Sequence, residues 1–93
     1  MTVHRRVVIK NKQGLHARPA ALFVWLASKF DAEILVRRGN EEVNGKSIMG
    51  ILMLGCERGS VVDITAKGKD SVRAVAELAQ LLTKGLVESE KEK

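Results

Sequence analysis

The sequence predicts an α+β domain in which a four-stranded antiparallel sheet is covered on one face by three helices. Three observations support this fold class. Short segments rich in β-branched residues alternate with segments whose apolar residues recur at helical spacing. In chain order these segments read βαββαβα, with glycine-containing turns between several of them. Each helical segment has one apolar side, which favours helices packed on a single face of the sheet.

Length and composition indicate a single small domain. A chain of 93 residues has room for one modest core, and we expect the domain to span residues 1–87, followed by a charged, frayed tail over residues 88–93. The chain has neither an apolar run near the ~20 residues of a membrane span nor the apolar core of a signal peptide, so the cytoplasm is the expected location. Cys56 is the only cysteine, which excludes an internal disulfide.

No metal or cofactor is expected. Cys56, His4 and His16 are the only cysteine and histidines, and their spacing does not match that of metal ligands. We interpret Cys56 as a small apolar residue that fills space in the core.

The first third of the chain predicts a strand over residues 2–9, a loop over residues 10–15 and a helix over residues 17–29. The core face of this helix is expected to consist of apolar residues at helical spacing, namely Ala20, Phe23, Val24, Ala27 and Phe30. A second stripe, on another side of the helix, is formed by Arg18, Leu22, Trp25 and Lys29. An apolar pair flanked by cations outside the core face suggests a docking surface; the alternative is that Trp25 covers the edge of the core.

The middle of the chain predicts a hairpin and a short helix. Strands are expected over residues 32–38 and 41–44, joined by a turn at Gly39 and Asn40, which tolerate positive φ. Ser47 is a good N-cap for a helix over residues 48–54, and Gly55 is placed to end it. So short a helix cannot turn all of its apolar residues inward, and we expect some of these to be exposed: Ile48, Met49, Leu52 and Met53.

The last third predicts a strand over residues 61–66 and a final helix capped by Asp70 or Ser71. Gly85 is a possible stop for this helix. Its core face is expected to contain apolar residues at heptad-like spacing, namely Val72, Val75, Ala79, Leu82 and Leu86.

The segment from Asn11 to Ala21 reads N-K-Q-G-L-H-A-R-P-A-A and is the strongest candidate site. Gly14 marks a turn, and Pro19 fits the first turn of a helix, so His16 stands just outside a helix N-terminus. Free backbone amides and the positive end of the helix dipole attract an anion there, and Arg18 adds a fork of donors. These features fit an anion attached to, or transferred through, His16. The alternative is that His16 is simply a polar residue at a helix start.

Two motifs resemble those of the HPr family, the histidine-containing phosphocarriers of the phosphoenolpyruvate-dependent phosphotransferase system. They are G-L-H-A-R-P-A around His16 and N-G-K-S-I-M-G-I-L-M-L-G around Ser47, and the resemblance extends from about Val3 to Leu86. It implies an open-faced sandwich fold and a carrier, not an enzyme with its own turnover. It also implies that enzyme I phosphorylates the δ1 nitrogen of His16, that Arg18 steadies the phosphoryl group and that an EIIA domain removes it.

The resemblance further implies that an HPr kinase/phosphorylase phosphorylates Ser47 as a regulatory mark, whereas the alternative for Ser47 is a plain capping residue. Other segments resemble the nitrogen-related branch, NPr, which leaves the acceptor open between a sugar and a nitrogen EIIA. The motif K-S-I-M-G favours the sugar branch, and His16 excludes the regulatory paralogue that lacks the histidine.

The net charge of +5 raises nucleic-acid binding as a rival function. A low aromatic fraction of 3% argues against a base-stacking surface, and we expect no nucleic-acid partner. Arg5, Arg6, Lys10 and Lys12 could form a basic patch, but we interpret them as a solvated strand face. We expect a monomer that does not insert into membranes and that docks its partners through one surface beside His16, formed by Leu22, Trp25, Ile48, Met49, Leu52 and Met53.

Overall fold

A computed structural model describes residues 1–84 of the chain. Its elements follow the predicted order βαββαβα: β1 (Thr2–Val8), α1 (Ala17–Ala27), β2 (Glu33–Arg38), β3 (Glu41–Asn44), α2 (Ile48–Met53), β4 (Val61–Lys67) and α3 (Ser71–Lys84). Gly85, Leu86 and the expected tail over residues 88–93 lie outside the described residues. The domain boundary after residue 87 therefore stays a prediction.

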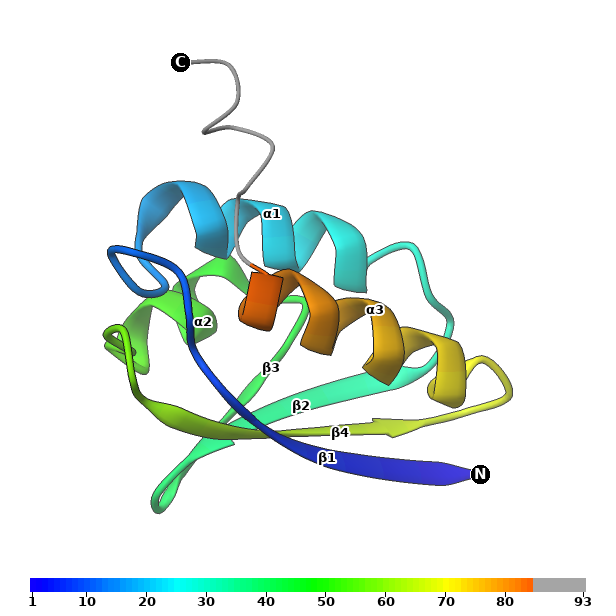
Figure 1. The fold of residues 1–93 in the computed structure, drawn as a ribbon. Coiled ribbons are helices and arrows are strands. Elements are labelled where there is room, and N and C mark those ends of the chain that lie inside the picture. Colours follow the sequence, from blue (N-terminus) through cyan, green and yellow to red (C-terminus); the bar gives the residue numbers. More distant parts are fainter. Residues whose placement is uncertain (85–93) are drawn as a thin grey trace.

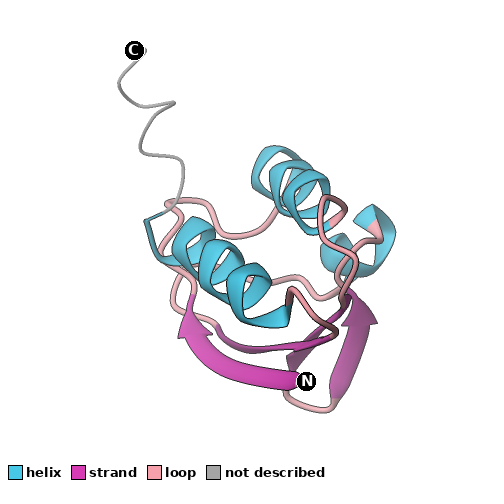
Figure 2. Ribbon diagram, turned by 90° about the vertical axis from the view of Figure 1, so that its right-hand side faces the viewer, coloured by secondary structure: helices cyan, strands magenta, loops and turns pink. Residues whose placement is uncertain are grey.

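The four strands form one antiparallel sheet in the order β1-β4-β2-β3. β4 lies between β1 and β2, with Val62 opposite Val7 and Ile64 opposite Val36. All three helices lie on the same side of this sheet, and its other side is open (Figure 1, Figure 2). The predicted fold class is confirmed.

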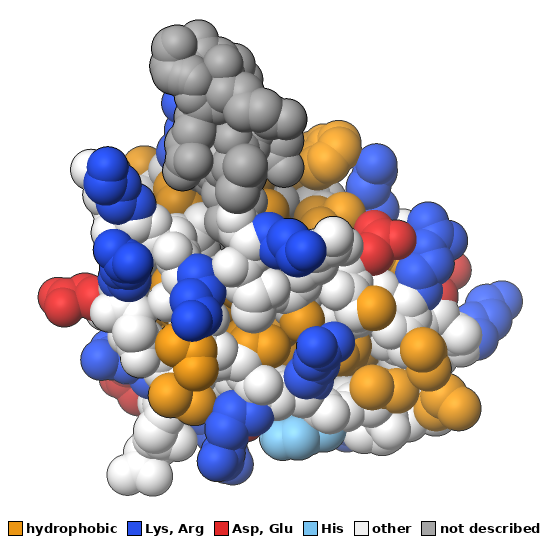
Figure 3. All heavy atoms as spheres, in the orientation of Figure 1, with side chains coloured by type: hydrophobic (Ala, Val, Ile, Leu, Met, Phe, Trp, Pro, Cys, Tyr) orange, Lys and Arg blue, Asp and Glu red, His pale blue; other side chains and the backbone are white. Residues whose placement is uncertain are grey.

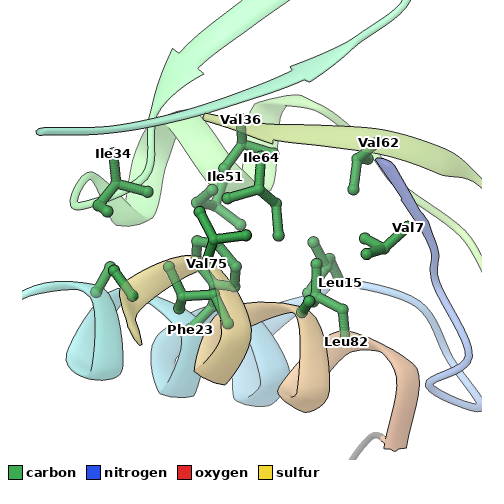
Figure 4. Packing of buried hydrophobic residues seen from close by; sticks show 14 of the residues in the cluster. Val7, Leu15, Phe23, Ile34, Val36, Ile51, Val62, Ile64, Val75 and Leu82 are labelled. Atoms are coloured by element: carbon green, nitrogen blue, oxygen red, sulfur yellow. The ribbon is translucent and has the colours of Figure 1, made fainter. Parts of the chain in front are cut away.

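The core fills the space between the helices and the inner face of the sheet (Figure 4). Ile34, Val36, Val62 and Ile64 alternate with exposed or half-buried neighbours along their strands, and all four are fully buried. The helices meet them with buried side chains that include Phe23, Ile51, Val75 and Leu82. Complete burial of one such side chain stabilises the fold by about 1.5–3 kcal/mol before entropy is counted, so these residues specify which face of each element turns inward.

Two details of the helices differ from the prediction. α1 ends at Ala27, before Lys29, although the predicted core residue Phe30 is still buried. Val72 was expected on the core face of α3 but is 57% exposed, so that prediction is wrong. The buried face of α3 instead consists of small and apolar residues that recur at three and four positions: Ser71, Ala74, Val75, Leu78, Ala79 and Leu82.

The open face of the sheet is polar near β1 and β4. The guanidinium of Arg6 donates to Asp63 Oδ1 at 3.1 Å, and His4 Nδ1 lies 3.2 Å from Thr65 Oγ1. Arg5, the neighbour of Arg6, falls on the opposite face because side chains alternate along a strand. Arg5 and Arg6 therefore do not form one patch, and the interpretation of this strand as a solvated face fits for Arg6.

Candidate functional site

His16 is the N-cap residue of α1 and is exposed. Its backbone is extended, with φ −105° and ψ −158°, and its carbonyl oxygen accepts a hydrogen bond from the backbone N–H of Ala20 at 2.9 Å. The side chain makes no capping hydrogen bond. The backbone of His16 thus completes the helix start, while the imidazole remains available for chemistry.

The loop before His16 is fastened to the segment that follows α2. The backbone N–H of Leu15 donates to the carbonyl oxygen of Cys56 at 2.8 Å, and the Leu15 side chain is buried. Gly14 adopts φ +75°, which favours glycine. A Cβ at this position would collide with the carbonyl oxygen of Cys56 and lie 2.7 Å from Glu57 Cα. Only glycine permits this close approach of the two backbones.

Further backbone hydrogen bonds hold the start of the same loop. Ile9 donates to the Ser60 carbonyl oxygen at 2.8 Å and accepts from Gly59 at 2.9 Å. Lys10 donates to the Leu82 carbonyl oxygen, near the end of α3, at 3.0 Å. The loop that presents His16 is therefore anchored to two distant parts of the chain, which limits how far the imidazole can be displaced.

The electrostatic setting of His16 is positive. The first turn of α1 contains no acidic residue, so nothing in that turn offsets the positive end of the helix dipole. Arg18 is the second residue of the helix, and its exposed side chain makes no hydrogen bond or ion pair within residues 1–84. Pro19 lies in the same turn, where its missing N–H costs no helical hydrogen bond, and its ring is buried. An anion on the imidazole would meet free backbone amides and a nearby cation.

Ser47 starts α2 and caps it, as predicted. Its hydroxyl oxygen accepts a hydrogen bond from the backbone N–H of Gly50 at 3.1 Å, and its carbonyl oxygen accepts from Ile51 at 3.0 Å. The side chain is half-buried. Ser47 is therefore a structural residue of α2 whatever further role it has.

The other end of α2 is held by a residue that sequence reasoning missed. The Arg38 guanidinium donates to the carbonyl oxygens of Leu54 at 2.9 Å and Gly55 at 3.3 Å. A cation at a helix C-terminus is favourable, and here it also satisfies carbonyls that lack partners within the helix. Arg38 lies at the end of β2, 16 residues before Leu54, so no local sequence pattern connects the two.

Exposed apolar side chains lie on α1 and α2, which pack against each other. On α1, Trp25 is 60% exposed, and Lys29 Nζ lies 4.2 Å from the centroid of its ring. The predicted excess of apolar residues on α2 is confirmed, because only Ile51 of this helix is buried. All six residues of the predicted docking surface are exposed on these two helices, and we keep the name docking surface for this set: Leu22, Trp25, Ile48, Met49, Leu52 and Met53.

Within residues 1–84 no cluster of histidine, cysteine and carboxylate side chains could hold a metal ion. Cys56 is a buried free thiol whose pKa is raised by burial, which outweighs the opposing effect of Arg38. Its interpretation as an apolar filler fits this burial. In this same part of the chain, none of the helices is long and apolar enough to cross a bilayer.

Comparison with known proteins gives matches over most of the chain. A family model described as the PTS HPr component phosphorylation site matches residues 3–84. The chain is 40% identical over 82 residues to the HPr-like protein Crh of Halalkalibacterium halodurans, covering 88% of this chain and 98% of that protein.

Solved structures agree with these matches. The phosphocarrier protein HPr from Bacillus anthracis aligns with a TM-score of 0.85 at 44% identity, covering 87% of this chain and 96% of the other. An HPr dimer from Thermoanaerobacter tengcongensis aligns with a TM-score of 0.68 at 51% identity, covering 90% and 91% of the two chains. The chain therefore belongs to the HPr family of phosphocarrier proteins of the phosphotransferase system.

Proposed function

We propose that His16 accepts a phosphoryl group from phospho-enzyme I and passes it to an EIIA domain. The observation that carries this proposal is the exposed imidazole at the N-terminus of α1, which has no capping bond and no acidic residue in the first helical turn. A histidine whose side chain capped the helix would have one ring nitrogen engaged in a hydrogen bond to the backbone. A free one at the positive end of a helix suits a group that carries an anion for a short time.

The chemistry requires little from the carrier beyond a nucleophile and a stable position. The neutral imidazole supplies an electron pair from one ring nitrogen to phosphorus, while the bond from phosphorus to the donor group breaks and its electrons leave with the donor. The resemblance assigns the δ1 nitrogen to this step. The amides of α1 and the guanidinium of Arg18 then stabilise the phosphoryl charge, by about 0.3–1 kcal/mol for an exposed helix dipole. Stabilisation of this size holds the group without trapping it.

Labelling with enzyme I and phosphoenolpyruvate tests the proposal. Wild-type protein should gain one acid-labile phosphate, and His16→Ala should gain none, because the nucleophile is absent. Arg18→Ala should accept the group more slowly, by about tenfold for a lost charge-assisted contact of ~1.4 kcal/mol. Arg37→Ala is the matched control, since Arg37 is an exposed arginine on β2. Full labelling of His16→Ala would show that His16 is not the acceptor.

We further propose that enzyme I and EIIA contact the docking surface in turn. Methionine and leucine side chains adapt to different partners, and an exposed tryptophan is a common centre of binding energy. Trp25→Ala should weaken enzyme I binding by about 2 kcal/mol while the free energy of unfolding changes little, because Trp25 is 60% exposed. Val72→Ala on α3, with an exposure of 57%, is the control. If both variants bind alike, the docking surface lies elsewhere.

Ser47 is proposed as a regulatory phosphorylation site for an HPr kinase/phosphorylase. Its hydroxyl lies at the start of α2, where the helix dipole favours a phosphate, and beside the exposed apolar residues of that helix. A phosphate adds about −1.5 to −2 charge there, which opposes an acidic partner. Ser47→Asp should keep the cap and weaken enzyme I binding, whereas Ser47→Thr should keep both. Equal binding by the two variants would argue against this regulation.

The choice of acceptor, the location and the oligomeric state are also proposals. The motif around Ser47 supports a sugar EIIA over the NPr-type nitrogen branch, and transfer assays with one EIIA of each kind would decide between them. We propose a cytoplasmic monomer that has no metal or organic cofactor and no nucleic-acid partner. Light scattering on the phosphorylated and free forms would test the monomer, for which the dimeric relative is a direct alternative.

A further inference from the structure

Arg38 ends β2 on the face of the sheet that the helices cover. Side chains alternate along a strand, so Arg38 falls on the same face as the fully buried Val36, while its neighbour Arg37 falls on the open face. A charge on the covered face is stable only when its donors find partners. The Arg38 guanidinium finds them at the end of α2, where it donates to the carbonyl oxygens of Leu54 at 2.9 Å and Gly55 at 3.3 Å.

The segment that Arg38 holds also fixes the loop before His16. Cys56 directly follows Gly55 in this segment. Its carbonyl oxygen accepts the backbone N–H of Leu15 at 2.8 Å, and Leu15 directly precedes His16. The segment after α2 and the loop before α1 lie at the same end of the domain (Figure 1). Residues 54–56 therefore bond to Arg38 on one side and to the loop that presents His16 on the other.

The surroundings of residues 54–56 leave little room for adjustment. The side chains of Leu54 and Cys56 are 2% and 4% exposed. Burial raises the pKa of the Cys56 thiol, and the Arg38 guanidinium opposes this effect because a cation favours the thiolate, which agrees with a position close to the segment. The backbone of Gly14 packs so closely against the Cys56 carbonyl that a Cβ would not fit between them. A displacement of this segment would therefore be passed on to the loop.

We infer that Arg38 is a positioning residue for phosphoryl transfer, which holds residues 54–56 and through them the loop that presents His16. The inference rests on the proposed function. The reaction itself is unchanged, since a ring nitrogen of His16 forms the bond to phosphorus while the bond from phosphorus to the donor group breaks. Arg38 acts on how well the ring is placed, and a displacement on the order of 1 Å can slow such a step about 100-fold.

The contribution of Arg38 lies in its two hydrogen bonds more than in its charge. Lys and Arg side chains are dense over the left end of the molecule in Figure 3, where acidic side chains are sparse. One cation fewer therefore changes the electrostatic setting of His16 little. The bonds to Leu54 and Gly55 come from Arg38 alone among the side chains of residues 1–84.

The reactivity of Cys56 measures whether Arg38 holds this segment. Cys56 is the only cysteine and is buried, so its reaction with an aromatic disulfide reagent requires local opening. Arg38→Ala should react about tenfold faster than wild type, the ratio that corresponds to ~1.4 kcal/mol. Loss of the charge alone would slow the reaction, because less thiolate would form. Arg37→Ala removes an equal charge from the open face and should react like wild type, and Ile34→Val, which loses one buried methylene at the other end of β2, controls for a general loss of stability.

Single-turnover transfer from phospho-enzyme I separates positioning from binding. At saturating phospho-enzyme I, Arg38→Ala should accept the phosphoryl group about three- to tenfold more slowly, with a half-saturating concentration within about twofold of wild type. Arg38→Lys keeps the charge and a donor for one carbonyl, so its rate should fall between those of Arg38→Ala and wild type. Arg37→Ala and Ile34→Val should both transfer at the wild-type rate.

The outcomes distinguish this inference from the proposed function. If wild type is labelled on His16 while Arg38→Ala transfers as fast as Ile34→Val, the inference is wrong and the carrier function stands, even if Cys56 reacts faster. A raised half-saturating concentration with an unchanged rate at saturation would place Arg38 in the contact with enzyme I and also overturn the inference. If wild type is not labelled, the proposed function fails and the inference fails with it.

Discussion

α1 and α2 begin in opposite ways, although the N-cap residue of each has an extended backbone. Ser47 turns its hydroxyl oxygen to the backbone N–H of Gly50 and completes α2. His16 completes α1 with its carbonyl oxygen alone, and its imidazole makes no capping bond. The Ser47 side chain is therefore part of the helix cap, whereas the His16 side chain makes no hydrogen bond to its helix.

The difference follows from how much of each helix is buried in the core. α1 tolerates an uncapped start because it spans 11 residues and is anchored by buried Pro19, Ala20 and Phe23. α2 spans six residues and buries only Ile51, so it depends on Ser47 at one end and Arg38 at the other. The candidate site residue His16 therefore lies at the start of a helix that needs no side-chain cap. The capping residues Ser47 and Arg38 lie at the two ends of the helix that buries only one residue in the core.

Gly14→Ala should have the largest effect on stability. The new Cβ would collide with the Cys56 carbonyl oxygen and occupy a backbone conformation of φ +75°. We expect a loss of about 3 kcal/mol or more in the free energy of unfolding, measured in urea, together with slower phosphoryl transfer because the loop before His16 must move. Gly39→Ala is the control, since its φ of +61° is similar but no atom lies within 4 Å. Equal losses in the two variants would mean that the close approach at Gly14 contributes nothing.

Ser47→Ala should have a smaller effect, with the opposite functional consequence. Removal of the cap should lower the free energy of unfolding by about 1 kcal/mol and leave phosphate labelling intact. His16→Ala should change stability by less than about 0.5 kcal/mol and abolish labelling. Denaturant unfolding of both variants under one set of conditions measures this contrast. A larger loss of stability for His16→Ala would show that the two helix starts do not differ as described.

Local patterns in the sequence predicted most of the fold, together with the position of the candidate site residue His16 at the start of a helix. The βαββαβα order, the hairpin at Gly39, the cap at Ser47 and the exposed apolar residues of α2 follow from turn residues, capping residues and hydrophobic period, which act over a few residues. Their agreement with the structure reflects a chain whose local preferences match its global fold.

Features that depend on distant contacts were not predictable in this way. The Leu15 bond to Cys56 and the Arg38 bonds to α2 join segments whose proximity arises only after the sheet has formed. The predicted burial of Val72 was wrong because a heptad-like pattern fitted several apolar residues of α3. In the structure the buried face of this helix instead includes the polar residue Ser71.

Asp70→Asn tests a third kind of helix start and should have a smaller effect on stability than Gly14→Ala. Asp70 precedes α3, and its carboxylate accepts the backbone N–H of Asp31 at 2.8 Å and of Ala32 at 2.9 Å. These bonds, that of Asp31 foremost, hold the pKa of Asp70 below its usual value of 3.8. Because the folded-state pKa is lowered, the carboxylate stabilises the fold above about pH 4, and this contribution is lost as the pH falls through the folded-state pKa.

The pH dependence of unfolding isolates that contribution. Asp70→Asn should be less stable than wild type at pH 7, and the two should converge once the pH falls below the lowered pKa of Asp70, because wild type then also lacks the charged acceptor. Urea unfolding at a series of pH values measures the convergence. Glu77→Gln is the control, since the Glu77 carboxylate makes an exposed ion pair with Arg73 at 3.0 Å, and such pairs add little stability. A constant gap between Asp70→Asn and wild type down to pH 2 would show that the Asp70 bonds do not depend on its charge, and that the tie between α3 and the start of β2 is held by other contacts.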